Sequence, residues 1–166
     1  MAASHTISLM LTVAALCCLL PSAAAQKPDL AIAVCRSTRD FAFCRAAVYS
    51  DPRAPGADRY ELIDIIFREA YRNASDTRGY IAGEIKSGAN SLRKCLADYD
   101  KAVEILEGVL NDLNSESYYD LDSRSLDVQR RVSDCVKGLR GRSPLTQRNR
   151  NMLKFANMCY AVSKLF

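Results

Sequence analysis

Two consecutive amphipathic segments constrain the fold of this chain more than any other feature. Between Leu92 and Leu113 the apolar residues recur three and four positions apart, and the same spacing returns between Tyr118 and Leu139. Side chains three and four residues apart share one face of an α-helix. The polar stretch 114–117 between the segments is short. The sequence therefore predicts two long helices packed antiparallel.

A cysteine on the apolar face of each segment sets the register of this helix pair. In antiparallel helices the numbers of facing residues have a constant sum, and Tyr99 with Val132 gives 231. Cys95 with Cys135 gives 230, which places both cysteines in one layer. A disulfide needs Cα atoms about 4.4–6.8 Å apart, a separation that packed helices can provide. We therefore expect a Cys95–Cys135 bond.

Residues 1–25 have the pattern of a secretory signal peptide. They contain no Lys, Arg, Asp or Glu, the stretch from Ile7 to Leu20 is almost wholly apolar, and Ala23–Ala25 supply small residues for cleavage. The apolar run is shorter than the roughly 20 residues of a membrane span, which disfavours the alternative of an uncleaved anchor. We expect residues 26–166 to be secreted and free of the membrane.

Five of the seven cysteines follow the predicted signal peptide: Cys35, Cys44, Cys95, Cys135 and Cys159. In a secreted protein an odd number indicates two disulfides and one free thiol. Cys35 and Cys44 lie in short apolar pieces joined by turn residues, so we pair them across a helical hairpin, although five cysteines allow fifteen two-bond schemes. Cys159 lies on the apolar face of the last segment, where a buried free thiol is expected rather than a reactive one.

Two further long helices complete the predicted fold. Asp58 stands three residues before Glu61 in a capping-box arrangement, and Ser87-Gly88 ends that helix. Ser143 as N-cap with Pro144 in the first helical position predicts the start of the last helix. Its inward face is Met152, Phe155, Cys159, Val162 and Phe166. We expect an all-α fold, with a short helical hairpin and linker over 26–56 and a disulfide-bridged, up-down-up-down four-helix bundle over 57–166.

Two features of the first long helix stand apart from this pattern. Gly79 and Gly83 would each cost a helix about 1 kcal/mol relative to Ala, so we expect them to allow close approach of a neighbour. Asn73-Ala74-Ser75 is an acceptor sequence for N-glycosylation, with Asn73 at the border of the exposed face. The sequence leaves the occupancy of Asn73 open.

Several kinds of chemistry are absent from the chain. Its one histidine, His5, lies in the predicted signal peptide, which excludes a histidine-based triad, general base or metal ligand from the mature protein. No phosphate-binding loop, Gly-x-Ser-x-Gly or Cys-x-x-Cys is present, so we expect no cofactor and no metal. A hydrolase would need paired carboxylates in a cleft, whereas the acids here occupy outward helix positions. The net charge of +4 is mild, and the basic C-terminal third lacks the interleaved aromatics of a nucleic-acid binder.

Charge is distributed unevenly along the chain. Residues 95–122 carry a net charge of −7, and residues 130–154 carry +7. In the predicted bundle these stretches place their charges toward opposite ends. Such polarity can orient a partner during encounter, although ordinary solvated helix faces are an equally good explanation for any single residue.

Several motifs resemble the plant invertase and pectin methylesterase inhibitor family. They are Cys35-Arg-Ser-Thr38, Phe43-Cys44, Ser50-Asp51-Pro52-Arg53, Ala57-Asp58, the cysteine-led segment Cys95 to Val103, Cys135 and Cys159. The resemblance covers residues 27–166. Two departures stand out: residues 126–134, ahead of Cys135, are bulkier and more charged than in the family, and the Pro-Lys-Phe segment of some invertase inhibitors is absent.

The resemblance implies a secreted, non-enzymatic inhibitor of the apoplast or cell wall, with a vacuolar location if the target is a vacuolar invertase. Such an inhibitor would act as a monomer that binds one target enzyme in a 1:1 complex and obstructs its active-site cleft. The target would be pectin methylesterase or acid invertase (β-fructofuranosidase), and the sequence does not choose between them. The alternative is a non-inhibitory protein of the same fold that binds the cell wall or is associated with pollen.

Exposure on the predicted hairpin of long helices suggests which residues would contact the target. They are Lys101, Glu104, Glu107, Asp122, Arg124, Gln129 and Arg130. A rigid, disulfide-pinned surface suits obstruction of a cleft, because less conformational entropy is lost on docking.

Overall fold

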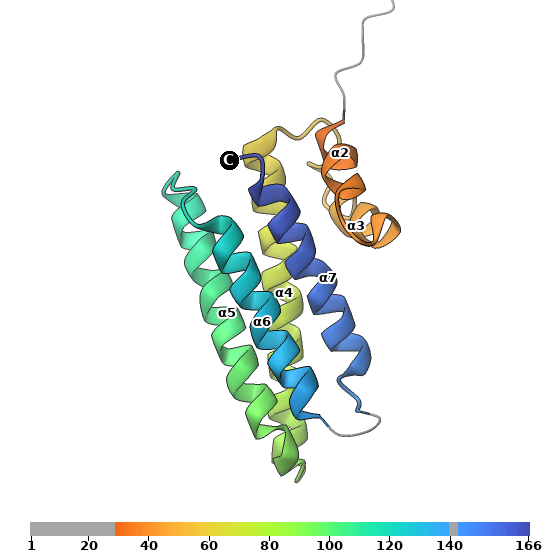
Figure 1. The fold of residues 1–166 in the computed structure, drawn as a ribbon, viewed down its shortest axis with the longest axis vertical. Helices are drawn as coiled ribbons and strands as arrows, with labels where there is room; N and C mark the ends of the chain where they lie inside the picture. The colour runs from red at the N-terminus through yellow and green to blue at the C-terminus, as the bar shows by residue number, and fades with distance from the viewer. Residues whose placement is uncertain (1–28, 140–142) are drawn as a thin grey trace, which may run out of the picture.

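The computed structural model describes residues 29–139 and 143–166, so the predicted signal peptide lies outside the described residues. Throughout this part of the chain the regular structure is helical, which confirms the predicted all-α class (Figure 1). The elements are α2 (Leu30–Arg36), α3 (Phe41–Val48), α4 (Arg59–Lys86), the 3₁₀-helix η1 (Asn90–Leu92), α5 (Arg93–Asn114), α6 (Leu121–Gly138) and α7 (Thr146–Ser163).

Helices α4 to α7 form the bundle. Each packs against the next along the chain, and α7 closes the bundle by packing against α4. Figure 1 shows the four helices side by side with alternating direction, and α2 and α3 set against the side of α7. The core between the helices holds Leu62, Ile66, Tyr99, Leu106, Val128, Val132, Met152 and Phe155, among others. These residues lie on the apolar faces that the three-four spacing predicted.

Helix α4 begins and ends at the predicted signals. The Asp58 carboxylate accepts hydrogen bonds from the backbone N–H groups of Tyr60 and Glu61, and the Glu61 side chain accepts one from the Asp58 backbone. Gly88, just beyond the helix, has φ of +105°, a conformation that favours glycine. Gly79 and Gly83 do not have the predicted role: a Cβ at either position would meet nothing within 4 Å, so no neighbour approaches them closely.

The turn between α5 and α6 is longer than the sequence suggested. Helix α6 begins at Leu121 rather than near Tyr118. Glu116 and Asp120 both adopt left-handed backbone conformations with φ of 56°, which interrupt the helical path. The Tyr118 ring instead stacks on Phe166, with the ring centroids 4.6 Å apart. The three-four spacing placed Tyr118 in the helix because it lies three residues before Leu121. That spacing cannot distinguish a helical residue from a turn residue just ahead of the helix.

Helix α7 also differs at both ends from its predicted extent. It begins at Thr146, and Ser143 Oγ accepts a hydrogen bond from the backbone N–H of Leu145 at 3.1 Å. The prediction of Ser143 as N-cap and Pro144 as the first helical residue was therefore two residues early. Phe166 is not on the inward face: the helix ends at Ser163, so this ring is released from the helical repeat and is 41% exposed.

The helical hairpin α2–α3 is short, and Asp29 and Asp40 cap its helices. A disulfide joins Cys35 to Cys44, whose Cα atoms are 5.4 Å apart, the same pair that the sequence suggested. Asn157 on α7 accepts a hydrogen bond from the Arg39 backbone N–H at 2.9 Å. Lys154, also on α7, forms an ion pair with Asp40 at 2.8 Å. These contacts hold the turn of the hairpin against the bundle.

Candidate functional site

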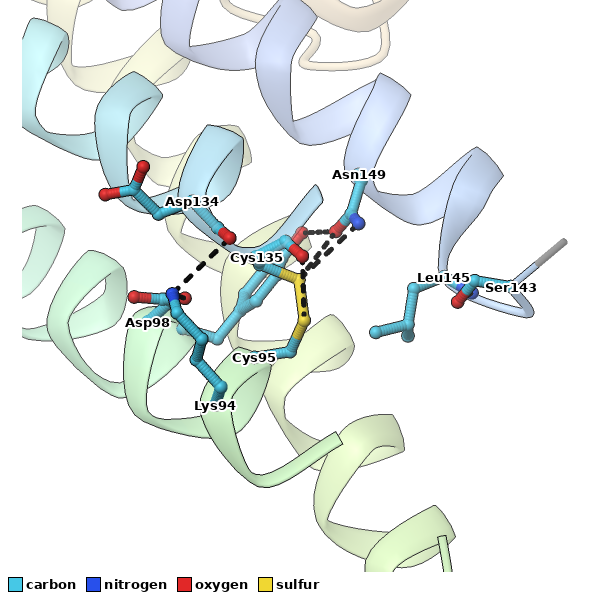
Figure 2. Close-up of a disulfide and its surroundings, with 9 residues drawn as sticks. Lys94, Cys95, Asp98, Asp134, Cys135, Ser143, Leu145 and Asn149 are labelled. Atoms are coloured by element: carbon cyan, nitrogen blue, oxygen red, sulfur yellow. Dashed lines mark hydrogen bonds and ion pairs between the residues drawn. A yellow bond between two sulfur atoms is a disulfide. The ribbon is translucent and has the colours of Figure 1, made fainter. Parts of the chain in front are cut away.

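The candidate site is the outer surface of the α5–α6 pair, which is pinned from within by a disulfide (Figure 2). Cys95 and Cys135 are bonded, and their Cα atoms lie 4.5 Å apart. Both side chains are buried. The bond therefore connects the two helices in the layer that the constant-sum register gave, and it limits how far they can slide past each other.

A buried polar residue on α7 supports this disulfide from the core side. The amide of Asn149 is only 2% exposed and lies 3.5 Å from the Cys135 sulfur (Figure 2). Its Oδ1 also accepts a hydrogen bond of 2.8 Å from the Tyr99 hydroxyl. Sequence reasoning missed Asn149. Its position could have indicated a buried polar contact, because Asn149 lies three residues before Met152 on the apolar face of α7. An amide without a hydrogen-bond partner would be costly there.

On the solvent side, Lys94 bridges the two helices near the disulfide. Its Nζ lies 2.9 Å from a carboxylate oxygen of Asp98 on α5 and 3.4 Å from the carbonyl oxygen of Asp134 on α6 (Figure 2). The Asp134 carboxylate is bound in turn by Lys137 at 3.1 Å, and this interaction lowers the pKa of Asp134. Both carboxylates are therefore engaged in ion pairs within the protein.

Three of the seven residues suggested as target contacts lie together on α5. Lys101, Glu104 and Glu107 are all exposed. Lys101 and Glu104 form an ion pair at 2.6 Å across one turn of the helix. A surface ion pair of this kind adds little to stability, so these side chains are available to a partner at low cost.

The four residues on α6 do not form one patch with them. Arg124 forms an ion pair with Asp112 on the neighbouring helix α5, with 2.5 Å between the guanidinium nitrogen and the carboxylate oxygen. Asp122 faces the other way and pairs with Lys164, 2.9 Å away beyond the end of α7, and this contact lowers the pKa of Asp122. Gln129 lines a hollow on the α7 side of α6, and exposed Arg130 pairs with Asp127. The suggested residues thus spread from the outer face of α5 to the α6–α7 side of the bundle.

The predicted charge polarity takes a definite form in the fold. The acidic turn between α5 and α6 lies at the same end of the bundle as the C-terminus, and α7 begins at the opposite end (Figure 1). Arg148 and Arg150 lie on the first turns of α7. At the acidic end, however, Asp112 and Asp122 are already neutralised by Arg124 and Lys164. The field toward a partner is accordingly weaker than the sequence totals of −7 and +7 suggest.

The remaining residues singled out in the sequence lie away from this surface or beneath it. Cys159 is a free, buried cysteine, and burial raises the pKa of its thiol, so it is not poised for reaction. Asn73 is half-buried in the middle of α4, and its buried Oδ1 has no hydrogen-bond partner among the described residues.

Two negative findings apply to residues 29–139 and 143–166. No group of three or more His, Cys, Asp or Glu side chains in these stretches is arranged to hold a metal ion. None of the helices described there combines the length and the apolar character needed to cross a membrane. The α5–α6 surface carries charged and polar side chains, several of which are paired within or between the two helices.

Comparisons with known proteins agree with this architecture. A curated relative from Arabidopsis thaliana, named cell wall / vacuolar inhibitor of fructosidase 2, is 31% identical over 124 residues, which cover 71% of this chain and 69% of the relative. A second relative from the same plant, pectinesterase inhibitor 2, is 28% identical over 119 residues, covering 69% of this chain and 64% of its own length.

The same fold is found in solved structures. A crystal structure of a mutant form of a pectin methylesterase inhibitor from Arabidopsis superposes with a TM-score of 0.70 at 15% identity, covering 80% of this chain and 94% of that one. A further pectin methylesterase inhibitor from Arabidopsis thaliana gives a TM-score of 0.61 at 14% identity, covering 84% of this chain and 97% of that one. The family model described as plant invertase/pectin methylesterase inhibitor matches residues 29–162. The chain belongs to this family.

Proposed function

We propose that this protein inhibits a plant carbohydrate-active enzyme, either pectin methylesterase or acid invertase, by docking the outer surface of α5 and α6 over the active-site cleft. Relatives named as inhibitors of a fructosidase and of a pectinesterase support both targets. The protein acts as a monomer in a 1:1 complex and catalyses no reaction itself. It is secreted to the cell wall after cleavage behind residue 25, or is delivered to the vacuole if its target is a vacuolar invertase.

The observation that carries this proposal is the way the α5–α6 surface is held. The Cys95–Cys135 bond pins the two helices from within, and Lys94 and Arg124 connect them on the solvent side. An obstructive inhibitor gains affinity when its contact surface loses little entropy on binding. The α5–α6 surface is held by a disulfide on its buried side and by interhelical contacts on its solvent side, so it should lose little entropy on binding.

Inhibition assays with both enzyme classes test the proposal. The refolded, oxidised protein, with both disulfides verified, is mixed with a plant pectin methylesterase and with an acid invertase at acid pH. We expect stoichiometric inhibition of one of them. Failure to inhibit either enzyme would contradict the inhibitory function.

A pair of matched variants locates the docking surface. Lys101→Ala/Glu104→Ala removes the exposed ion pair on α5, and Glu69→Ala/Arg72→Ala removes a pair of the same spacing on α4. The α5 variant should weaken inhibition by about tenfold or more, because the proposal places this pair among the few interface positions whose truncation costs more than about 1 kcal/mol. The α4 control should change inhibition by less than about twofold. Equal effects of the two variants would place the interface elsewhere.

The secretory route makes Asn73 available for N-glycosylation, and we propose it as the acceptor. Protein secreted by plant cells should begin at Gln26 and should lose mass on enzymatic removal of N-glycans. Asn73→Gln should abolish that loss of mass. If the mass of the wild-type protein does not change, Asn73 is unoccupied.

A further inference from the structure

A groove lies on the opposite side of α6 from α5, and of the seven suggested target contacts only Gln129 lines it. The turn of the α2–α3 hairpin lies against α7, and a partly open hollow of about 350 Å³ is bordered by this turn, α6 and α7. Its lining includes Arg39 on the turn, Gln129 and Ser133 on α6, and Arg150, Leu153 and Asn157 on α7. The hollow therefore lies between three elements: α6 and α7 pack directly against each other, and the hairpin packs against α7.

Among the described residues, two guanidinium groups of this groove form no ion pair with a carboxylate. Within residues 29–139 and 143–166, no ion pair of 4.0 Å or less involves Arg39 or Arg150, and both residues are exposed. The third cation, Lys154, is already paired with Asp40 at 2.8 Å, so these two charges cancel. The groove thus carries two positive charges that are available to an anionic ligand. A guanidinium binds a carboxylate through two parallel hydrogen bonds, which makes carboxylates its preferred partners.

The groove continues along the bundle beyond the first hollow. A second hollow, of about 430 Å³, shares Arg150 and Leu153 with the first and extends to Leu139 and Thr146. From Asn157 to Thr146 along α7 the groove spans about 16 Å, at 1.5 Å per helical residue. The groove is therefore elongated, and it suits a chain-like ligand better than a single small anion.

The lining beside the two arginines is mixed rather than uniformly charged. Gln129 and Ser133 provide amide and hydroxyl groups, while Leu153 provides an apolar surface shared by both hollows. A sugar ring presents hydroxyl groups at its edge and C–H groups on its faces, and it can satisfy both kinds of lining at once. An acidic peptide would bring carboxylates to the arginines but would not need this alternation of hydroxyl-binding and apolar surface.

We propose that the groove between the α2–α3 turn, α6 and α7 binds an acidic polysaccharide, a chain of uronate sugars whose carboxylates are held by Arg39 and Arg150. Because the groove lies away from the outer face of α5, the protein can hold such a polymer and a target enzyme at the same time. The proposal is independent of the enzyme that is inhibited, and it does not require inhibition.

Equilibrium binding to a galacturonate oligomer of defined length tests this proposal. Two reference ligands are used, the fully methyl-esterified oligomer and a neutral oligosaccharide of similar length. The wild-type protein should bind the free uronate oligomer and neither reference ligand. Its affinity should fall as salt rises, because the contacts are ionic and screened. No binding of the free uronate oligomer, or equal binding of the esterified form, would overturn the proposal.

Charge-matched variants separate the groove from the general basicity of the protein. Arg39→Gln/Arg150→Gln removes the two groove cations, and Lys86→Gln/Arg93→Gln removes two exposed cations near the α4–α5 turn. The groove variant should bind the uronate oligomer at least tenfold more weakly than wild type, and the control variant less than twofold more weakly. Equal losses would mean diffuse attraction by surface charge and would overturn the proposal.

Enzyme inhibition is measured with the same variants. The groove variant should inhibit as well as wild type. If it loses inhibition but keeps its affinity for the uronate oligomer, the groove contacts an acidic segment of the target enzyme and the polysaccharide proposal is wrong. All four substituted residues are exposed, so unchanged thermal unfolding should confirm that every variant is folded.

Discussion

The hydroxyl group of Tyr99 on α5 donates a hydrogen bond of 2.8 Å to Oδ1 of Asn149 on α7, in the centre of the bundle. Both residues are buried, and the Asn149 amide also touches the sulfur of Cys135 on α6. One polar cluster therefore connects three helices at the level of the Cys95–Cys135 bond. Buried polar groups tolerate few arrangements, so this cluster favours a single register of α7 against the α5–α6 pair.

Replacing Tyr99 with Phe should destabilise the protein by about 1–3 kcal/mol, because it leaves a buried amide oxygen without its hydroxyl donor. Burial raises the pKa of Tyr99, so the hydroxyl remains a protonated donor at neutral pH. Chemical denaturation with the disulfides intact measures the change. Tyr119→Phe serves as the control, since that side chain is 80% exposed and should lose less than about 0.5 kcal/mol. Equal losses from both variants would contradict the proposed role of the buried pair.

Replacing Gly79 or Gly83 with Ala should stabilise the protein by about 0.5–1 kcal/mol each, because alanine loses less backbone entropy in a helix. Both positions lie within α4, and a Cβ at either meets nothing within 4 Å. Thermal unfolding measures the gain. Gly88→Ala should act in the opposite direction, because the φ of +105° at that position strains any other residue. Destabilisation by Gly79→Ala would indicate a close contact at that position.

Removing the Cys95–Cys135 bond as Cys95→Ala/Cys135→Ala should cost about 4 kcal/mol on the chain-entropy treatment, because the bond closes a loop between residues 40 apart in sequence. Cys35→Ala/Cys44→Ala, with a separation of 9, should cost less, about 3 kcal/mol. Denaturant titration compares the two variants. Inhibition should also weaken in the first variant, since the α5–α6 surface is no longer pinned. Full inhibition by this variant would show that the bond serves stability alone.

The contact between Asp40 and Lys154 should make docking of the hairpin sensitive to acid. The Lys154 ammonium group, together with the Phe43 backbone N–H, lowers the pKa of Asp40 below its ordinary value of 3.8. A carboxylate with a lowered folded-state pKa stabilises the fold above its unfolded-state pKa, and this stabilisation is lost as the pH falls through the folded value. Asp40→Asn should therefore lower the thermal midpoint near neutral pH, and this difference should shrink as the pH falls below the ordinary aspartate pKa of 3.8 and through the lowered folded-state pKa of Asp40. A pH-independent difference would assign the effect to capping of α3 rather than to charge.

Local sequence signals predicted most of the bundle, because they depend on residues a few positions apart. The three-four spacing found the long helices, and Asp58 with Glu61 marked the start of α4. The cysteine register gave the same Cys95–Cys135 pairing that the structure contains, since two helices joined by a short turn have little freedom to slip. The same local signals misplaced the starts of α6 and α7. The start of α6 follows the left-handed backbone of Glu116 and Asp120, and the start of α7 follows the turn in which the Ser143 hydroxyl accepts a hydrogen bond from Leu145.

Contacts between distant parts of the chain were decided only by tertiary structure. The backbone N–H of Arg39 donates a hydrogen bond to the side chain of Asn157, which is 118 residues away in the sequence. No local sequence pattern indicates that the hairpin turn packs on α7. The exposed residues on α5 and α6 were identified one by one, yet the fold directs Asp122 and Gln129 away from Lys101. The sequence by itself determined most of the inward-facing residues, because burial follows helical periodicity, and it failed at Phe166, which lies beyond the end of α7. Which outward residues share a surface depended on how the helices pack, and that is a property of the whole chain.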